Sequence, residues 1–347
     1  MADQPSIAVL GAGSIGCWIG GAWSAAGLPV TLIGRERIGA EIAEHGLTVT
    51  DYKGGRIALG PDEVRFTARP QALKDADVIA LCVKSIDTES AAREIARHGR
   101  KGATVISFQN GVSNADTLRK ALPRFQVAQG MVPFNVAHLG RGRWHKGVQG
   151  DLVAEGTPVT ERISELTAGT PAHLLLARDM KPIAWGKLLF NLNNAINALS
   201  GKTLLEELSV RDYRRVLAAS MIETLEVLKA AGIAPAKLGP IAPALLPHAI
   251  GAPDFVFRNL LLRVMKIDAK ARSSMADDFA AGRRTEIDHL NGEVVRLAGA
   301  IGRKAPVNQA IVDLVKQYEE GVERIWSADE LRRYVLEGHR TVRGFGY

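Results

Sequence analysis

A glycine-rich turn near the start of the chain restricts the fold more than any other feature. The apolar run from Ile7 to Leu10 leads directly into Gly11-Ala12-Gly13-Ser14-Ile15-Gly16, and an apolar segment with helical spacing follows. In such a strand–turn–helix unit the first glycine makes the tight turn, the second leaves room for a pyrophosphate, and the third lets helix and strand pack closely. We therefore expect residues 11 to 16 to bind a dinucleotide at the helix N-terminus; the alternative is a structural glycine turn.

The tip of the second predicted strand, Val30 to Ile33, indicates which dinucleotide is bound. NAD-specific proteins usually place an acid at this tip, on the ribose 2′-hydroxyl. Here the tip carries Arg35, whose guanidinium suits a 2′-phosphate through paired hydrogen bonds, so we expect NADP(H). Alternatively, Arg35 is a surface residue and Glu36 takes the role of the acid.

Strands are also predicted at Val78 to Val83 and at Thr104 to Phe108, with helical segments between them. This alternation is typical of a parallel, doubly wound sheet. The stretch from Leu47 to Arg65, with a turn at Asp51 to Gly55, is expected to form an inserted hairpin.

Polar residues follow two of these strands, namely Lys84 and Asn110. Ligands of such sheets lie across the carboxyl ends of the strands, so both residues are expected near the nicotinamide half of the cofactor. The alternatives are a solvated loop lysine and a turn asparagine.

Short strand-like pieces separated by turns between Gln126 and Asp179 indicate that antiparallel strands complete the sheet. After Pro182 the strand pattern ends and helical periodicity continues over Ala184–Leu199, Val210–Ala231, Thr285–Ile301 and Asn308–Glu320. We expect an α/β Rossmann-type, NADP-binding N-terminal domain over residues 1–181 and an all-α substrate and catalytic domain over residues 182–320. Residues 321–347 form a C-terminal extension, with a short helix and a loose tail.

Composition narrows the function classes. The 347 residues carry a net charge of +7, but Lys and Arg are spread along the chain and aromatic residues make up only 5%, so no nucleic-acid partner is expected. The positive field favours small anions. Glycines and Pro29 interrupt the apolar stretch from Ile7 to Ile33, which argues against a signal peptide or membrane span. With two cysteines, Cys17 and Cys82, we expect a cytoplasmic protein and no metal site.

The segment from Trp185 to Leu199 holds four asparagines among apolar residues, although asparagine is unfavourable inside a helix. At 100° per residue Lys187, Asn191 and Asn194 share one face and Asn197 flanks it. This polar face predicts the wall of a polar cleft, where these residues contact a substrate. The alternative is a snorkelling lysine with capping amides.

A later segment has a local explanation. Ser274 with Asp277, and Thr285 with Asp288, match capping boxes at helix starts. Glu286 would then be an acid in the first turn of a helix.

Taken together, these motifs resemble the ketopantoate reductase (2-dehydropantoate 2-reductase) family. The resemblance spans residues 5 to 320 and rests on GxGxxG, the arginine after the second strand, VK, QNG, WxKLxxN at Trp185 and SSMxxDxxxGRxTEID at Ser273. It implies NADPH as cofactor and Lys187 as general acid, with Glu286 as its partner and as a contact of substrate and cofactor. It further implies that Ser274 anchors a carboxylate and Asn191 grips the substrate, while Lys84 and Asn110 border the cofactor and the active site.

The implied reaction is hydride transfer from NADPH to the carbonyl carbon of a small 2-oxo acid, converting 2-dehydropantoate to pantoate. The alternatives are a reductase of another branched 2-oxo acid and a non-catalytic NADPH-sensing module, which would need neither Lys187 nor Glu286. A homodimer is a candidate assembly.

One position departs from the family pattern. Many members have a second helix asparagine four residues after the first, whereas this chain has Ala195 there and repeats the spacing at Asn193 and Asn197. Either the helix carries a local bulge or the pocket differs.

Overall fold

The computed structural model describes residues 4–261 and 271–338. The chain divides into two compact units, Met1–Met180 and Lys181–Tyr347. The division lies next to the boundary expected from the loss of the strand pattern.

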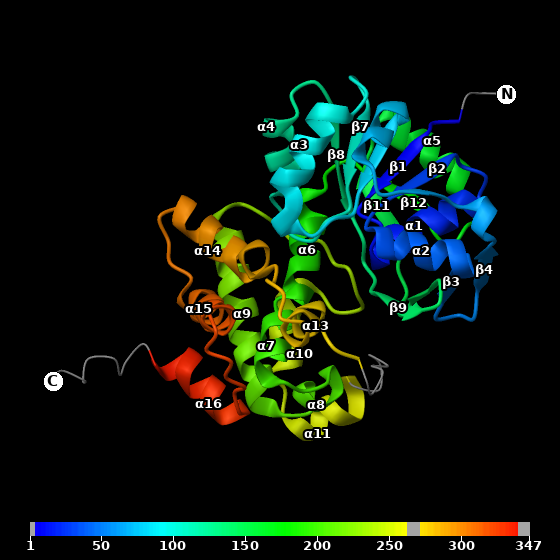
Figure 1. The fold of residues 1–347 in the computed structure, drawn as a ribbon. Helices are drawn as coiled ribbons and strands as arrows, with labels where there is room; N and C mark the ends of the chain where they lie inside the picture. The colour runs from blue at the N-terminus through cyan, green and yellow to red at the C-terminus, as the bar shows by residue number, and fades with distance from the viewer. Residues whose placement is uncertain (1–3, 262–270, 339–347) are drawn as a thin grey trace. The chain divides into compact units, whose positions relative to one another are not determined.

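The first unit is built on a twisted sheet with helices on both sides (Figure 1). Within the described residues this sheet has eight strands in the order β12-β11-β8-β7-β6-β1-β2-β5, and β1 pairs in parallel with both β2 and β6. The order from β5 to β8 is that of a Rossmann fold, in which ligands bind where the strand order reverses, here between β1 and β6. The strands are β1 (Ile7–Leu10), β2 (Val30–Ile33), β5 (Arg65–Thr67), β6 (Val78–Leu81), β7 (Thr104–Ser107), β8 (Gln126–Met131), β11 (Leu152–Glu155) and β12 (Leu174–Ala177).

A second, four-stranded sheet in the described part of this unit has the order β4-β3-β10-β9. It consists of β3 (Leu47–Asp51), β4 (Arg56–Leu59), β9 (Val136–Gly140) and β10 (Arg143–Lys146). The inserted hairpin is therefore confirmed. The expectation that antiparallel strands from residues 126–179 complete the main sheet is confirmed for β11 and β12, because β11 runs antiparallel to β8 and β12 pairs in parallel with β11. It is wrong for β8, which pairs in parallel with β7, and for the β9–β10 hairpin, which joins β3 instead.

Helices and short helical turns connect these strands. They are α1 (Ser14–Ala25), α2 (Glu36–His45), η1 (Pro61–Glu63), η2 (Pro70–Asp75), η3 (Ser85–Asp87), α3 (Thr88–His98), α4 (Asn114–Ala121) and α5 (Pro158–Thr167). Helix α5 was not predicted, although Thr157 caps it and Pro158 is its first residue, as is common at helix starts.

Helix α1 lies between the two sheets and fills the core on that side. Trp18 is buried, and its indole N–H donates to the carbonyl of Thr50 in β3 (3.1 Å). A Cβ added to Gly21 would lie 2.2 Å from a side-chain carbon of Leu47, so the glycine lets the helix pack closely on the small sheet. The helix that follows the glycine-rich turn is thereby fixed on both sides.

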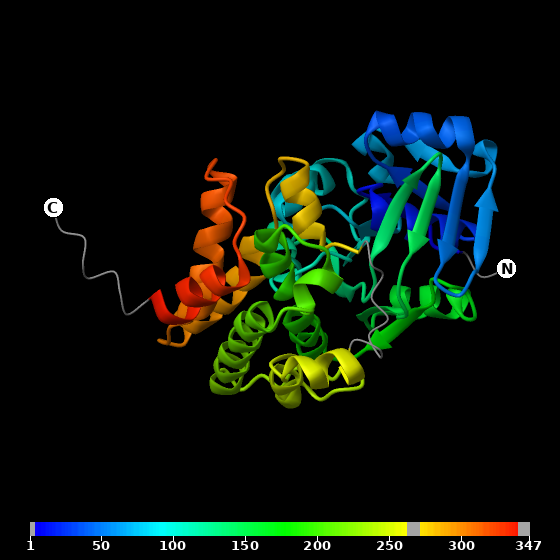
Figure 2. The same cartoon turned by 90° about the horizontal axis from the view of Figure 1, so that it is seen from below.

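The second unit is all-helical within the described residues (Figures 1 and 2). Its elements are α6 (Lys181–Asn191), α7 (Asn193–Ser200), α8 (Leu204–Leu208), α9 (Arg211–Ala230), η4 (Pro243–Leu245), α10 (Leu246–Ile250), α11 (Asp254–Val256), η5 (Phe257–Leu261), α13 (Ser274–Ala280), η6 (Ile287–His289), α14 (Asn291–Ala300), α15 (Pro306–Glu319), α16 (Ala328–Arg332) and η7 (Arg333–Glu337). The Rossmann-type and all-α architecture is thus confirmed. The single helix predicted over Ala184–Leu199 is interrupted at Leu192, and the helix predicted from Thr285 begins only at Asn291.

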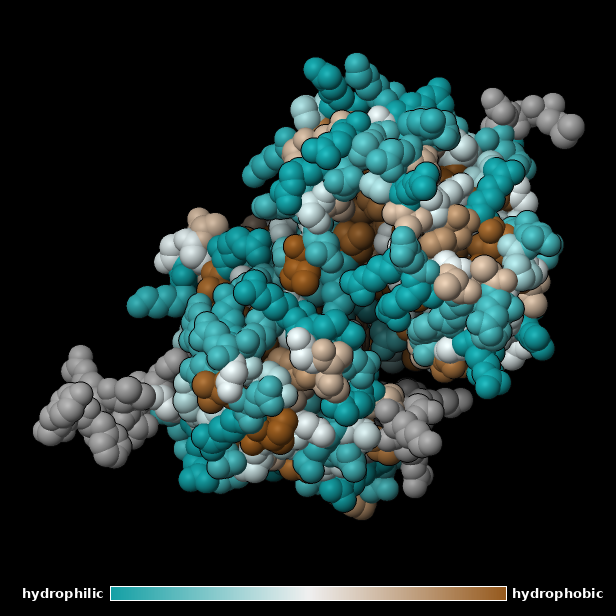
Figure 3. All heavy atoms as spheres, in the orientation of Figure 1, coloured by the Kyte–Doolittle hydropathy of each residue, from teal (hydrophilic) through white to brown (hydrophobic). Residues whose placement is uncertain are grey.

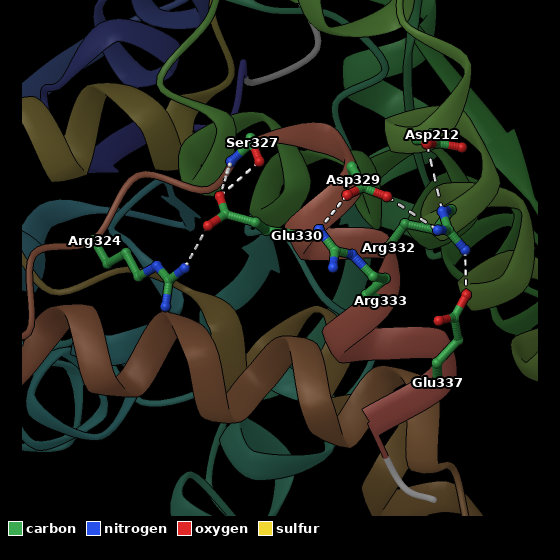
Figure 4. Close-up of polar contacts among 8 residues, drawn as sticks. All are labelled: Asp212, Arg324, Ser327, Asp329, Glu330, Arg332, Arg333 and Glu337. Carbon is green, nitrogen blue, oxygen red and sulfur yellow. Dashed lines mark hydrogen bonds and ion pairs between the residues drawn. The ribbon is translucent and has the colours of Figure 1, made fainter. Parts of the chain in front are cut away.

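The C-terminal segment from residue 321 to 338 packs against the helical unit. The Trp326 amide donates to the Leu199 carbonyl at the end of α7 (2.8 Å), and Tyr213 Oη donates to the Trp326 carbonyl (2.7 Å). Leu331 and Val335 are buried. Polar contacts on its surface are drawn in Figure 4: Arg324 with Glu330, Ser327 with Glu330, and Arg332 with Asp212, Asp329 and Glu337. The predicted short helix is confirmed, whereas the predicted tail after residue 338 lies outside the described residues.

The face of the molecule in Figure 3 is mostly hydrophilic, with hydrophobic residues in separate patches. Across residues 4–261 and 271–338, no helix combines the length and the apolar character needed to span a membrane.

Candidate functional site

The glycine-rich turn has the geometry that its sequence predicts. Gly11 has a φ of +103°, and its amide and that of Ala12 both donate to the Ile33 carbonyl at the end of β2 (3.0 and 2.9 Å). A Cβ on Gly11 would lie 2.6 Å from the backbone nitrogen of Val83, and a Cβ on Gly16 would lie 2.3 Å from the Gly11 carbonyl oxygen. The tight turn and the close packing of helix and strand are therefore confirmed.

Gly13 differs from the other two glycines. A Cβ at this exposed position would meet no atom within 4 Å. Gly13 is the N-cap of α1, no side chain caps this end by a hydrogen bond, and the first turn holds no acidic residue. Because the first amides of a helix and its dipole attract anions, this end of α1 suits a pyrophosphate.

Arg35 lies at the tip of β2, close to the same turn. Its neighbour Gly34 packs on Ala12, since a Cβ on Gly34 would lie 2.6 Å from the Ala12 Cβ. The Arg35 side chain is exposed, and its carbonyl accepts the Ile38 amide at the start of α2 (2.9 Å). Glu36 is the acidic residue in the first turn of α2, a position that stabilises the helix and accounts for it without a ligand.

Lys84 and Asn110 follow β6 and β7, and a direct bond joins the two loops. The hydroxyl of Ser85 donates to the Asn110 carbonyl (2.8 Å). Both Lys84 and Asn110 are partly exposed. The expected placement at the carboxyl ends of neighbouring strands is therefore what the fold shows.

A buried polar network that was not predicted from the sequence supports these loops. The Gln109 amide donates to the Lys84 carbonyl (3.3 Å) and to Thr88 Oγ1 (2.9 Å). The Asn114 amide donates to Ser85 Oγ (3.0 Å), and Asn114 Oδ1 accepts from Thr88 Oγ1 (3.1 Å). The four polar side chains of the network are buried. Its only sequence signal was the run of amide and hydroxyl residues after the two strands.

Lys187 and Asn191 stand one turn apart on α6, so they share a face of the helix. Asn191 is buried, and Lys187 is partly exposed as a whole residue although its ammonium group is buried. Burial of the Lys187 ammonium lowers its pKa from 10.5 to about 8. A lysine with this pKa is mostly protonated at neutral pH and yet can release its proton readily.

The break at Leu192 leaves Asn191 in α6 and the other three asparagines in α7. Asn194 is partly exposed, whereas Asn193 and Asn197 are buried. The Asn193 and Asn197 amides donate to Glu207 Oε2 (3.0 and 3.5 Å). Burial raises the pKa of the Glu207 carboxyl to about 8.

Asn197 also joins two neighbouring segments of the unit. Its Oδ1 accepts the Ser273 amide (2.9 Å), and its Nδ2 donates to the Lys202 carbonyl (3.1 Å). Because both ends of the amide are used inside the unit, we correct the expected substrate contact of Asn197 to a structural role.

The cap of α13 is Ser273 and not Ser274 as expected. Ser273 is the N-cap, its Oγ accepting the Ala276 amide (3.1 Å) and donating to the Asn194 carbonyl (3.0 Å). The predicted capping box at Ser274 is wrong, because Ser274 is already the first helical residue and its side chain is exposed. Ser274 therefore has no capping duty.

Glu286 lies buried between α13 and α14, just before the short turn η6. The predicted capping box of Thr285 with Asp288 is wrong. Thr285 Oγ1 accepts the Ile287 amide (3.2 Å), and Asp288 pairs with Lys316 of α15 (2.7 Å). Glu286 is thus a buried acid in an irregular segment rather than an acid in the first turn of a long helix.

Comparison with known proteins adds to this geometry. The family model described as "Ketopantoate reductase PanE/ApbA" matches residues 7–156, and the model "Ketopantoate reductase PanE/ApbA C terminal" matches residues 179–319. The 2-dehydropantoate 2-reductase of Halobacterium salinarum is 29% identical over 318 residues, covering 89% of this chain and 97% of its own.

Solved structures agree with the family models. The PanE/ApbA family ketopantoate reductase from Ralstonia eutropha is 31% identical, with a TM-score of 0.77 over 91% of this chain and 98% of its own. A dimeric ketopantoate reductase from Staphylococcus aureus, 18% identical, has the same fold with a TM-score of 0.66, covering 91% of this chain and 99% of its own.

Proposed function

Because the chain belongs to the ketopantoate reductase family and is an oxidoreductase of that type, we propose that it reduces 2-dehydropantoate to pantoate with NADPH. The observation that carries this proposal is Lys187, a lysine of α6 whose pKa burial lowers to about 8, with Asn191 one turn away on the same face. General acid catalysis is most effective when the pKa of the acid lies near the working pH.

The first unit would hold the cofactor. The open N-terminus of α1 at Gly13 suits the pyrophosphate, and exposed Arg35 suits the 2′-phosphate. Lys84 and Asn110, at the carboxyl ends of β6 and β7, would border the nicotinamide half. When bound, NADPH supplies the hydride for the substrate carbonyl carbon.

Lys187 would complete the reaction on the substrate. As the carbonyl carbon is reduced, its oxygen gains negative charge and needs a proton. A protonated Lys187 both stabilises this charge and transfers the proton from Nζ to the oxygen, which gives the 2-hydroxyl group.

The substrate carboxylate and side chain would be held by polar groups of the second unit. Asn191 and Asn194 present amides from α6 and α7, and Asn194 has the more exposed side chain of the two. Ser274 offers an exposed hydroxyl that no capping bond occupies. Buried Glu286 would partner Lys187 and contact both substrate and cofactor.

A second substrate class is favoured by one observation. Ala195, the position that departs from the expected family pattern, is fully buried in this chain. The interruption at Leu192 leaves Asn194 as the partly exposed amide of α7, which gives a different arrangement of donors from the usual spacing. We therefore retain another branched 2-oxo acid as the alternative substrate.

The test is a steady-state screen with NADPH against 2-dehydropantoate and several branched 2-oxo acids, using wild type, Lys187→Met and the control Lys229→Met at an exposed site of α9. Lys187→Met should lower kcat by about 10² to 10⁴, while NADPH affinity and the control stay unchanged. In wild type, kcat should fall as pH rises above about 8, since only protonated Lys187 is an acid. A Lys187→Met enzyme within about threefold of wild type would rule out the acid role.

We further propose a homodimer, because a structural neighbour is described as dimeric. Light scattering during size-exclusion chromatography tests this, and a monomer at micromolar concentration would refute it. A cytoplasmic location is supported by the two free cysteines, Cys17 and Cys82.

A further inference from the structure

We propose that the last turn of α15, through Glu319 and Lys316, positions Glu286 for the reaction. This inference rests on the proposed function, since it assigns to Glu319 and Lys316 the task of holding a residue that acts in catalysis. Neither was a candidate from the sequence.

Glu286 lies in a segment that secondary structure alone does not hold. Between the end of α13 at Ala280 and the start of α14 at Asn291, the chain forms a turn, an irregular stretch and the short turn η6. Buried Thr285 and Ile287 flank Glu286. The precise place of Glu286 therefore depends on the side chains that bind this backbone.

Glu319 binds the segment on the N-terminal side of Glu286. The amide of Thr285 donates to Glu319 Oε1 at 2.7 Å. The Thr285 hydroxyl in turn accepts the amide of Ile287 (3.2 Å), so one chain of bonds reaches both neighbours of Glu286. A bond from a backbone amide to a carboxylate is charge-assisted and stronger than a neutral one.

Lys316, one turn earlier in α15, binds the segment on the other side of Glu286. Its Nζ lies 2.7 Å from Asp288 Oδ1, and the hydrogen bond with Asp288 raises the pKa of Lys316. Arg296 of α14 adds a bond to the Asp288 carbonyl (3.0 Å). Thr285, one residue before Glu286, and Asp288, two residues after it, are thereby both anchored.

The same turn of α15 also packs on the helix before the segment. The rings of Tyr318 and Phe279 stack in parallel with centroids 3.6 Å apart. Three residues of one helical turn thus contact α13, the stretch before Glu286 and the stretch after it. A helix is a rigid support, and supporting residues on rigid elements set the accuracy of a catalytic group.

The expected fall in kcat follows from the sensitivity of catalysis to geometry. A displacement of about 1 Å in a catalytic group can cost on the order of 10² in rate. Glu319→Ala removes the acceptor of the Thr285 amide, so we expect kcat to fall about 10- to 100-fold. Glu319→Gln keeps an acceptor oxygen and should retain most of the turnover. NADPH affinity should change far less than kcat, because the glycine-rich turn and Arg35 lie in the other unit.

The experiment compares Glu319→Ala, Glu319→Gln, Lys316→Met and Glu286→Gln in the full-length enzyme, with Glu320→Ala as a control at the adjacent exposed position. Each variant is measured for Tm, for NADPH Kd by fluorescence, and for kcat and KM. The proposal expects a loss of kcat in Glu319→Ala that Glu319→Gln largely restores, a loss in Lys316→Met, and no loss in the control.

Two results would overturn the proposal in different ways. If Glu286→Gln loses turnover but Glu319→Ala stays within threefold of wild type, Glu319 does not position Glu286, and the proposed function still stands. If Glu286→Gln keeps full turnover, the role of Glu286 in the proposed function is wrong, and its positioning fails with it. Should Glu319→Ala not fold, Lys316→Met decides, since unchanged kcat in that variant overturns the proposal.

Discussion

Glu207 makes the stability of the second unit depend on pH in an unusual direction. Its carboxyl is fully buried, and its pKa rises from 4.5 to about 8 because burial disfavours the charged form. A carboxyl with a raised folded-state pKa contributes stability that is complete below about pH 4.5. That stability is lost as pH rises through the folded-state value near 8.

The size of the effect follows from this shift. Each pKa unit corresponds to about 1.36 kcal/mol, so ionisation of Glu207 removes roughly 4 to 5 kcal/mol of unfolding free energy between these two pH values. Glu207→Gln cannot ionise and keeps an acceptor oxygen for the Asn193 and Asn197 amides. The variant should therefore match wild type near pH 5 and exceed its stability by roughly 3 kcal/mol near pH 7.

Urea unfolding at four pH values between 5 and 8 measures this difference, with Glu226→Gln at an exposed site of α9 as the control. The difference between Glu207→Gln and wild type should grow with pH, while the control stays parallel to wild type. Parallel curves for Glu207→Gln would show that Glu207 is not held protonated. Turnover of the variant should equal that of wild type, because Asn197 supports the fold and not the substrate.

Four further predictions concern the first unit. Gly13→Ala should fold normally, because its Cβ meets open space, yet lose about tenfold or more in NADPH affinity; unchanged affinity would exclude a pyrophosphate there. Gly16→Ala should lower Tm, since its Cβ would lie 2.3 Å from a carbonyl oxygen. An unchanged Tm would contradict this. Asn114→Ala breaks the polar network next to Lys84, so it should lower the free energy of unfolding in urea by about 1–3 kcal/mol and weaken NADPH binding. NADPH binding equal to that of wild type would show that the network is purely structural. Arg35→Asp should reduce kcat/KM with NADPH far more than with NADH, and equal losses would show that Arg35 does not bind the 2′-phosphate.

Local features of the fold and site could be predicted from the sequence. The turn at Gly11 follows from steric limits within a few residues, and the order of strands and helices follows from their periodicity. The pairing of the β9–β10 hairpin with β3 could not be predicted, because it joins residues far apart in the chain. A turn in the sequence indicates a hairpin but not the strand beside which the hairpin lies.

For the polar residues too, local patterns could be predicted and contacts between distant residues could not. Helical spacing placed Lys187 and Asn191 on one face, but it could not show that Asn197 meets Glu207 and Ser273 in the interior. Two adjacent serines fit the capping pattern, and only the backbone at Ser273 decides which one caps α13. Thr88 and Asn114 carry no motif, and they matter because two loops meet in space.

The C-terminal segment affects how the second unit forms during synthesis. The Leu199 carbonyl at the end of α7 accepts a hydrogen bond from the Trp326 amide, and the Tyr213 hydroxyl donates to the Trp326 carbonyl, 113 residues further along the chain. Contacts between such distant positions form late, because a long loop must close before they contribute. Helices α7 and α9 therefore remain without these two bonds until Trp326 leaves the ribosome. Until then, the surface that later covers Leu331 and Val335 stays exposed to other chains.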